Sequence, residues 1–165
     1  QYDRVLSIEM GASINLNGLP TTLRRDFKTL EPASRSVELV GALRAQYVGP
    51  APIRFFAPAF MRVLRFGGWY GKRFRLGAQS ELVGINRFRD GTESNDSVPM
   101  RAVIGPSVTD NRPAFVVTYP AGTRFPWGYA RDEIRALDEQ RFLGITVFTL
   151  PIVRHFPLAF LLIRE

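Results

Sequence analysis

The sequence predicts a mainly β protein, in which one antiparallel barrel of roughly eight strands carries one or two short capping helices. From about residue 37 onward, apolar and polar side chains alternate with the period of a half-buried strand. About eight such runs follow one another, and the short turns between them are typical of a meander that closes into a barrel. The 165 residues fit a single domain, 1–165, whose core needs no disulfide or structural metal.

Residues 1–36 are predicted to form an N-terminal arm and a helix. The apolar residues between Val5 and Met10 indicate either a first strand or a docking arm. Asn17-Gly18 then marks a turn. A short amphipathic helix with a threonine cap follows Pro20, because apolar residues recur at helical spacing at Leu23, Phe27 and Leu30. We expect this helix to pack over one end of the barrel.

Residues 37–66 are predicted to form a strand and a second helix. The strand covers 37–47 and ends at Gly49-Pro50. Residues 53–66 form a capping helix, apolar and rich in arginine, that begins or breaks near Pro58. We expect it to cover a barrel mouth, and a helix that simply packs on the core is the alternative.

Seven further strands are predicted after Gly67-Gly68, and turn residues separate them. They are Trp69–Leu76, Glu81–Arg89, Val98–Ile104, Ala114–Tyr119, Tyr129–Leu137, Arg141–Thr149 and Leu158–Ile163. The segments Phe142–Leu150 and Leu158–Ile163 are apolar on both faces, so something must cover them outside the barrel. Either the N-terminal helix or a second subunit provides this cover, and the sequence thereby favours a homodimer.

Composition narrows the function. The chain has no cysteine, which excludes thiol nucleophiles, zinc–cysteine sites and iron–sulfur clusters. Its net charge is +7, but basic residues alternate with acidic ones, as in Arg131-Asp132-Glu133. We therefore expect a solvated basic surface and no nucleic-acid partner; an anionic ligand, an acidic partner or a lipid headgroup surface are the alternatives. No apolar stretch is long enough for a transmembrane segment, and we expect a cytoplasmic protein.

Motifs for common chemistries are missing or weak. One histidine, His155, cannot form a multi-histidine metal site, although it could serve as an axial haem ligand or general base. The sequence has no nucleophile elbow, P-loop or dinucleotide fingerprint, so we expect no metal and no cofactor. Of the neighbours Asp132 and Glu133, only one can point into a barrel. An inward Asp132 would need a partner such as Arg101 or Arg131, and Glu133 would then face solvent.

The most distinctive segment is Gly67–Phe74, where two aromatic residues lie between glycines and precede two cations. Trp69 or Tyr70 is predicted to line a ligand pocket, with Lys72 or Arg73 pairing with an anionic group. A tryptophan plug packed under a cation is the structural alternative. The predicted ligand-binding residues are Trp69, Tyr70, Lys72, Arg101, Tyr119, Trp127 and Phe60; no catalytic residue is assigned.

Gly68-Trp69-Tyr70-Gly71-Lys72-Arg73-Phe74 resembles the Trp-Tyr-Gly-Lys-Arg-Phe signature of GXWXG-type bacterial proteins and their companion domain of unknown function. Leu143-Gly144-Ile145 is similar to a second segment of that family. The resemblance covers about residues 37–150 and implies a compact β-rich fold. The family's name-giving pattern would fall at Gly41–Ala45, where this chain has leucine and alanine. More broadly, the strand count resembles calycin-like barrels, barrel cyclases of polyketide pathways and haem-binding barrels.

Four functions remain open from the sequence. The barrel could bind a hydrophobic or amphipathic small molecule with an anionic end, anchored by Lys72 or Arg101. It could be a cyclase or isomerase (Diels-Alderase-like) that acts on a polyketide-like substrate mainly through shape and desolvation. It could bind haem through His155, or serve as a structural or nucleic-acid-interacting domain.

Overall fold

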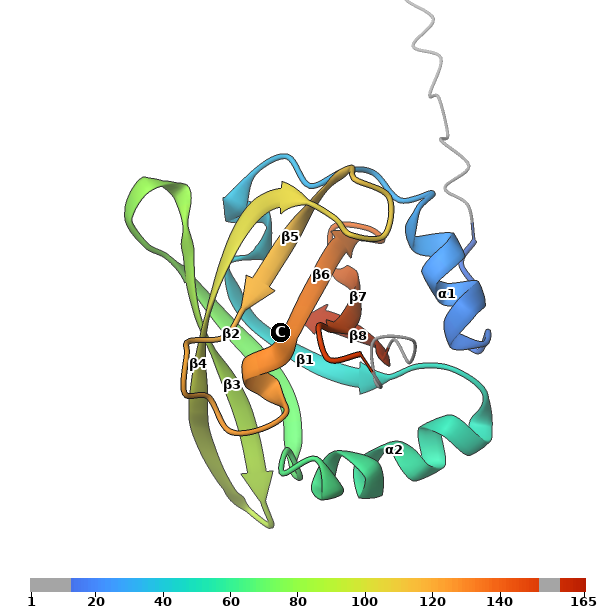
Figure 1. Cartoon of the computed structure of the whole chain (residues 1–165), viewed down its shortest axis with the longest axis vertical. Coiled ribbons are helices and arrows are strands. Elements are labelled where there is room, and N and C mark those ends of the chain that lie inside the picture. The colour runs from blue at the N-terminus through green and yellow to red at the C-terminus, as the bar shows by residue number, and fades with distance from the viewer. Residues whose placement is uncertain (1–12, 152–157) are drawn as a thin grey trace, which may run out of the picture.

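The computed structural model describes residues 13–151 and 158–165, and its strands form a closed antiparallel barrel (Figure 1). Each strand pairs with the next along the chain, and β8 pairs back onto β1. The strands are β1 (Gly41–Tyr47), β2 (Trp69–Leu76), β3 (Leu82–Asp90), β4 (Glu93–Pro106), β5 (Pro113–Thr118), β6 (Ala130–Ala136), β7 (Arg141–Phe148) and β8 (Leu158–Arg164). The predicted antiparallel barrel of about eight strands is confirmed.

Two strand starts differ from the prediction by more than two residues, each for a physical reason. The first strand begins at Gly41, whose φ of 124° interrupts the extended backbone, and residues Ser36–Leu39 form the 3₁₀-helix η1 instead. The fourth strand starts at Glu93 rather than Val98, because β3 and β4 continue as a hairpin whose tip carries mostly exposed, polar residues. This first part of β4 has no buried face, so its sequence shows no alternation of apolar and polar residues.

The helix α1 (Pro20–Phe27) covers the outside of the last two strands (Figure 1). Its Phe27 packs with Leu143 and Ile145 of β7, and its Leu23 packs with Leu161 of β8. This contact accounts for strands that are apolar on both faces, so a second subunit is not needed to explain them. The predicted threonine cap is wrong: Leu19 occupies the N-cap position without a side-chain hydrogen bond. The predicted arm at Val5–Met10 lies outside the described residues.

A buried arginine fixes the end of α1 to the barrel. The guanidinium of Arg135, on β6, donates two hydrogen bonds of 2.7 Å to the carboxylate of Asp110. It also donates to the carbonyl of Phe27, the last residue of α1, at 3.1 Å, and lies over the Phe27 ring. A planar donor with five N–H groups can satisfy several acceptors together, which makes a buried charge tolerable here.

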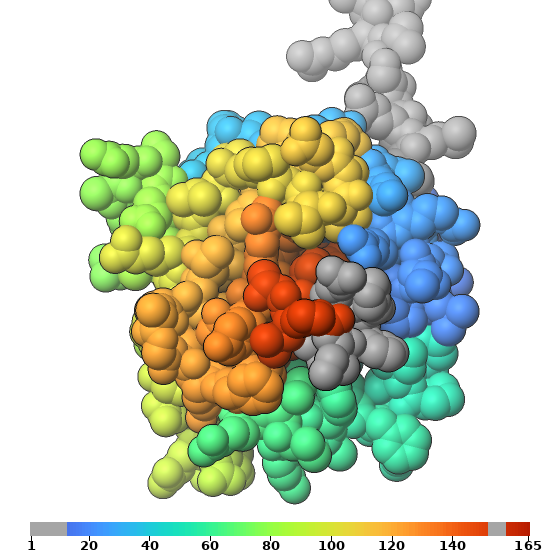
Figure 2. Space-filling view, viewed as in Figure 1, coloured from blue at the N-terminus to red at the C-terminus, as the bar shows by residue number. Residues whose placement is uncertain are grey.

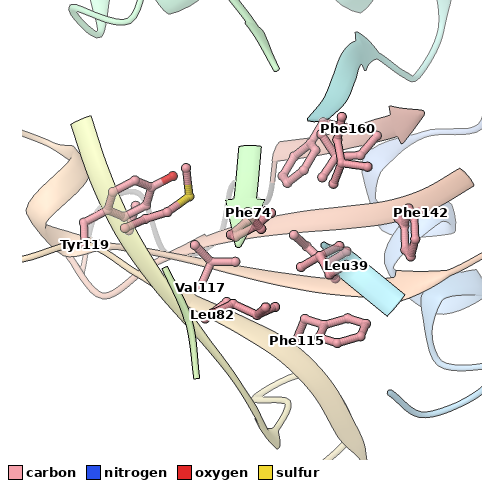
Figure 3. Close-up of a cluster of buried hydrophobic side chains, with 14 of the residues drawn as sticks. Leu39, Phe74, Leu82, Phe115, Val117, Tyr119, Phe142 and Phe160 are labelled. Carbon is pink, nitrogen blue, oxygen red and sulfur yellow. The ribbon is translucent and has the colours of Figure 1, made fainter. Parts of the chain in front are cut away.

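Large apolar side chains form a buried cluster inside the barrel (Figure 3). Leu39 enters from η1, and large residues from the strands surround it, each almost completely buried: Phe74, Leu82, Phe115 and Phe142. Gaps in such a core would cost stability, since interiors are packed as densely as organic crystals. The space for a guest is therefore confined to the opposite half of the barrel.

The helix α2 (Ala51–Val63) lies across the other end of the barrel, near the tip of the β3–β4 hairpin (Figure 1). The predicted apolar, arginine-rich helix is present, but it spans Ala51–Val63 rather than 53–66. The prediction that it begins or breaks near Pro58 is wrong, because Pro58 lies within the helix. Among its 13 residues only Met61 is buried. Much of α2 is therefore at the surface, as the space-filling view shows (Figure 2).

Candidate ligand-binding site

A cavity of about 70 Å³ lies between α2 and the barrel interior. Aromatic and aliphatic side chains form its walls, and four polar side chains lie at its floor. The lining residues from α2 are Ile53, Ala57, Phe60 and Met61; those from the strands and connections include Tyr47, Phe66, Trp69, Trp127, Leu158 and Phe160; the polar ones are Lys72, Tyr119, Asp132 and Thr146. An apolar pocket with a few convergent polar groups is the usual form of a small-molecule site.

A β-bulge brings Trp69 and Lys72 into the same interior. In a regular strand residues 69 and 72 would point to opposite faces, because side chains alternate. The pairing of β2 with β3 shifts between Trp69 and Gly71, so that Tyr70 is the extra residue of a bulge. Both Trp69 and Lys72 are consequently buried inside the barrel, whereas Arg73 is on the outside with Asp96, at 2.7 Å.

The ammonium group of Lys72 is at the centre of the polar floor. It donates to Asn86 Oδ1 at 3.0 Å and to the hydroxyl oxygen of Tyr119 at 2.9 Å, and it forms an ion pair with Asp132 Oδ2 at 2.9 Å. Strand register explains the first contact, because Lys72 and Asn86 are direct partners on β2 and β3. Three acceptors take all three of its N–H groups, so this cation has no donor left for a ligand.

Asp132 receives hydrogen bonds from two further side chains. The Tyr119 hydroxyl donates to its Oδ2 at 2.9 Å, and the Thr146 hydroxyl donates to its Oδ1 at 2.7 Å. Thr146 is the direct partner of Asp132 across β6 and β7, so register again sets the contact. What remains unused at the floor is acceptor capacity, on Thr146 Oγ1 and Asp132 Oδ1.

Burial and charge together shape the electrostatics of this floor. Lys72 and Asp132 are each about 1 % exposed, and a buried pair of this kind needs full hydrogen bonding to be tolerated. The Lys72 ammonium also lies over the rings of Trp69 and Tyr119, at 5.4 Å from each centroid. Burial, together with the nearby charge of Asp132, raises the pKa of Tyr119 well above its usual value, and burial raises the pKa of Tyr47 to about 12.

Five of the residues predicted from sequence meet at this cavity: Trp69, Lys72, Tyr119, Trp127 and Phe60. The indole N–H of Trp127 donates to the carbonyl of Leu64 at 3.0 Å, and its ring stacks on Phe66, which ties the end of α2 to the barrel. The indole N–H of Trp69 donates to Asn86 at 3.0 Å. Both tryptophans thus line the cavity with their rings and fix neighbouring segments through their indole N–H groups.

Two predicted residues lie elsewhere, which corrects the predicted site. Tyr70 is the outward residue of the bulge, where the guanidinium groups of Arg87 and Arg89 lie over its ring. Arg101 is exposed on the outer face of β4 and pairs with Glu81 at 3.4 Å. It therefore does not neutralise Asp132, which pairs with Lys72 instead.

The prediction that Glu133 faces solvent when Asp132 points inward is wrong. Glu133 is fully buried on the outer face of β6, because the β4–β5 connection covers it. Ser107 donates a 2.5 Å hydrogen bond to its carboxylate, and the backbone N–H of Val108 donates another at 2.7 Å. A loop folded over a strand is invisible to an argument from alternation alone.

Sequence reasoning missed Asn86 and Thr146, which complete the polar floor. A signal for each exists: both are polar residues at inward positions of otherwise apolar strands, and each is less than 4 % exposed. His155, the candidate haem ligand, lies outside the described residues. Within the described part of the chain, no group of three or more His, Cys, Asp or Glu side chains is arranged to hold a metal. None of the helices described there combines the length and apolar character needed to cross a membrane.

Comparison with known proteins supports the fold. No protein-family model matches the chain, and neither does any curated protein. One solved structure, a crystal structure of a protein from Thermomonospora curvata, is similar with a TM-score of 0.61 and 16% sequence identity. The match covers 88% of this chain and 86% of that one. At this identity the likeness concerns the barrel fold alone.

Proposed function

We propose that this protein binds a small hydrophobic or amphipathic molecule in the barrel beneath α2. The observation that carries the proposal is the combination of an apolar cavity with a fixed polar cluster at its floor. Buried polar networks are costly unless every member is satisfied, and hydrogen bonds within the chain hold the side chains of this one in place. Such preorganisation is what a binding site needs to orient one end of a ligand.

The size of the cavity suggests how a ligand enters. Its volume of about 70 Å³ is less than half of the roughly 150 Å³ cavity known to admit benzene. A polar head and a few carbons fit beneath the closed helix, and a longer tail requires α2 to move outward. The helix is suited to this, because Met61 is its only buried residue.

The hydrogen bonds of the floor suggest which polar end is bound. An anionic end, expected from the sequence, would find the Lys72 ammonium already neutralised by Asp132 and without a free N–H group. A hydroxyl or another donor would find acceptor capacity on Thr146 Oγ1. We therefore infer a ligand with a hydrogen-bond donor at its polar end.

Three ligands with equal chains test this inference: octane, 1-octanol and octanoate. Trp69 and Trp127 line the cavity, so their fluorescence reports binding. We expect 1-octanol to bind about tenfold tighter than octane, because one satisfied hydrogen bond contributes about 1.4 kcal/mol. Octanoate should bind most weakly, since its charge would be buried without a partner.

Thr146→Val provides the site-specific test, because it removes the acceptor with little change in volume. We expect it to change the affinity for 1-octanol and to leave that for octane unaltered, because it removes one acceptor of the octanol hydroxyl and takes the Thr146 donor away from Asp132 Oδ1. Thr118→Val, at an exposed position at the end of β5, is the matched control and should change neither. Strongest binding of octanoate, or no fluorescence response to any of the three, would contradict the proposal.

A second candidate is a cyclase or isomerase on the same scaffold. One observation favours it: the Tyr119 hydroxyl and the Asp132 carboxylate share a 2.9 Å hydrogen bond at a largely apolar cavity, which brings a proton donor and an acceptor together. A polyketide-like substrate could be folded there by shape, and the Tyr119 hydroxyl would have to turn its O–H from Asp132 to polarise a substrate carbonyl. Turnover of a linear polyene, lost in Tyr119→Phe while octanol binding persists, would favour catalysis over binding alone.

A further inference from the structure

The outward side of α2 is an exposed apolar surface flanked by arginines. Phe55, Phe56 and Val63 are 77%, 63% and 78% exposed, although residues of this kind are normally buried. Phe55 and Val63 are eight residues apart, so they share one side of the helix. They are distinct from the inward residues that line the cavity, such as Ala57 and Met61. A helix that is apolar on both sides normally has a partner on both sides.

A second exposed aromatic pair lies at the same end of the barrel. Phe125 and Tyr129, in the connection between β5 and β6, are 63% and 49% exposed, and their ring centroids are 6.2 Å apart. The neighbouring Trp127 donates its hydrogen bond to the carbonyl of Leu64, directly after α2. The two aromatic groups therefore border the same mouth, at the lower part of Figure 1.

The charge around this surface is one-sided. Residues 39–80 contain seven Lys and Arg and no Asp or Glu, while the rest of the chain has 15 of each, so this span carries the whole net charge of +7. Lys72 is internal and Arg73 pairs with Asp96, but Arg54, Arg62 and Arg65 are exposed along α2 and its end. Two acidic residues, Asp90 and Glu93, share a hollow with Arg62.

From this arrangement we propose that α2 docks on an anionic lipid surface, with Phe55, Phe56 and Val63 inserted among the headgroups and the arginines paired with phosphates. Aromatic and aliphatic residues on one side of a helix, with basic residues flanking them, are suited to lying in the membrane interface. A second copy of this chain fits less well. Two such surfaces brought face to face would place arginine against arginine, with no carboxylate on either helix.

The proposal does not depend on what occupies the cavity, but it would place the mouth of the barrel against the bilayer. A membrane-dissolved apolar molecule could then pass beneath α2 without crossing bulk water. Since most of α2 is not buried, insertion of its outer side into lipid could also draw the helix away from the barrel.

Vesicle co-sedimentation tests the proposal with the full chain. We expect binding to vesicles of phosphatidylcholine and phosphatidylglycerol at a 7:3 ratio, and at least tenfold weaker binding to phosphatidylcholine alone. Phe55→Ser with Phe56→Ser should weaken binding to anionic vesicles at least tenfold, because two aromatic rings no longer enter the interface. Arg54→Gln with Arg62→Gln should weaken it more than tenfold, at about fivefold per arginine.

Matched controls use exposed residues far from the mouth. Val103→Ser with Val108→Ser removes two exposed apolar side chains, and Arg75→Gln removes an exposed arginine of β2. All variants concern exposed side chains, so circular dichroism should confirm folding, and the controls should bind vesicles like wild type. The added fluorescence of Phe55→Trp should shift to the blue on anionic vesicles and be quenched by brominated lipid.

Four results would overturn the proposal. These are no binding to anionic vesicles, equal loss of binding in the Val103/Val108 control, tighter binding to a single-stranded oligouridine than to vesicles, and a stable dimer in sedimentation that protects Phe55. Octanol binding is measured without lipid, so the two experiments are independent. A failure to bind vesicles would leave the cavity proposal intact, and a failure to bind octanol would leave the membrane-docking proposal intact.

Discussion

The Lys72–Asp132 pair shows how a barrel interior accommodates two charges. Each group is buried, and each is hydrogen-bonded by neighbouring side chains: Lys72 to Asn86 and Tyr119, and Asp132 to Tyr119 and Thr146. The net attraction of such a pair is small once the cost of removing both ions from water is counted. Removing only one of the two charges destabilises the protein strongly, because the other charge is then buried without a partner.

We expect Asp132→Asn to lower the free energy of unfolding by about 3–5 kcal/mol, because it leaves Lys72 as an unpaired buried cation. Lys72→Met combined with Asp132→Leu should cost less than Lys72→Met alone or Asp132→Leu alone. Urea denaturation of wild type, these two single variants and the double variant completes the cycle. Asp96→Asn, which breaks the exposed pair with Arg73, is the control and should cost less than about 1 kcal/mol. Equal effects of Asp132→Asn and Asp96→Asn would contradict this account.

The burial of Tyr47 predicts how the stability of the protein changes at alkaline pH. Burial raises its pKa to about 12 in the folded protein, whereas the unfolded chain ionises near 10. The unfolded state then loses its proton first, so stability should fall as pH rises from about 10 to about 12. The burial that raises the pKa of Tyr119 acts in the same direction.

In Tyr47→Phe the fall in stability between pH 10 and 12 should be shallower than in wild type, as measured by urea midpoints across that range. The absorbance of tyrosinate should show one ionisation fewer near pH 12. Identical slopes in both proteins would mean that Tyr47 is not protected from water.

The residues of the candidate site were predictable only in part, for reasons of local geometry. Trp69, Lys72 and Tyr119 stand out by type and spacing, but alternation alone separates Trp69 from Lys72. The bulge at Tyr70 places both side chains inside the barrel. The sequence gives no sign of this bulge apart from the glycine, Gly71, that follows Tyr70. Asn86 was not identified because a polar residue on a half-buried strand is normally assigned to the solvent-facing side.

At the scale of elements, α1 buries the apolar outer face of β7 and β8, as the core residues bury the inner face. Its Leu23 and Phe27 are fully buried on β7 and β8. We expect Phe27→Ala to destabilise the protein by about 3–5 kcal/mol through the cavity it leaves and the lost packing under Arg135. Thermal denaturation measures this, and Leu19→Ala, at an exposed position beside α1, should stay within about 0.5 kcal/mol of wild type.

Helix and strand positions followed well from the sequence where one face is buried. β2 was predicted at its observed bounds, because Trp69 to Leu76 carries a clear alternation apart from the bulge. The tip of the β3–β4 hairpin was missed because water reaches both of its faces. The role of α1 as the outer cover was one of two alternatives, and only three-dimensional packing could choose between them.

At the scale of the whole molecule, closure couples residues that are distant in sequence. β1 cannot complete its pairing until β8 arrives, more than 100 residues later along the chain. All-β proteins, in which strand pairing joins residues farther apart in sequence than helical contacts do, fold in milliseconds to seconds. The native state should also melt as one unit, because the same sheet surrounds the solid half and the cavity half.

Tryptophan fluorescence and far-ultraviolet circular dichroism test this prediction, because Trp69 and Trp127 report on the cavity end and the circular dichroism reports on the sheet. We expect the two urea transitions to coincide within error, and refolding to be slower than one millisecond. An earlier transition in fluorescence would mean that the cavity end opens separately from the barrel.

The charge distribution is also a property of the whole chain, and local inspection of the sequence does not reveal it. Counting acids and bases turn by turn suggests an even mixture, as at Arg131–Glu133. Summing over long spans instead separates a neutral remainder from residues 39–80, which carry all of the excess. Such a windowed sum needs only the order of the residues, and it points to the helix that covers the mouth.

Gly144 of β7 sets the width of the cavity from behind. The ring of Phe160, a wall residue, occupies the space where a side chain at position 144 would begin. Any larger residue at that position would collide with the ring, so the ring would have to shift and the shape of the cavity would change. Substitution at position 144 should therefore change the size of ligand that the cavity accepts, although residue 144 itself does not line the cavity.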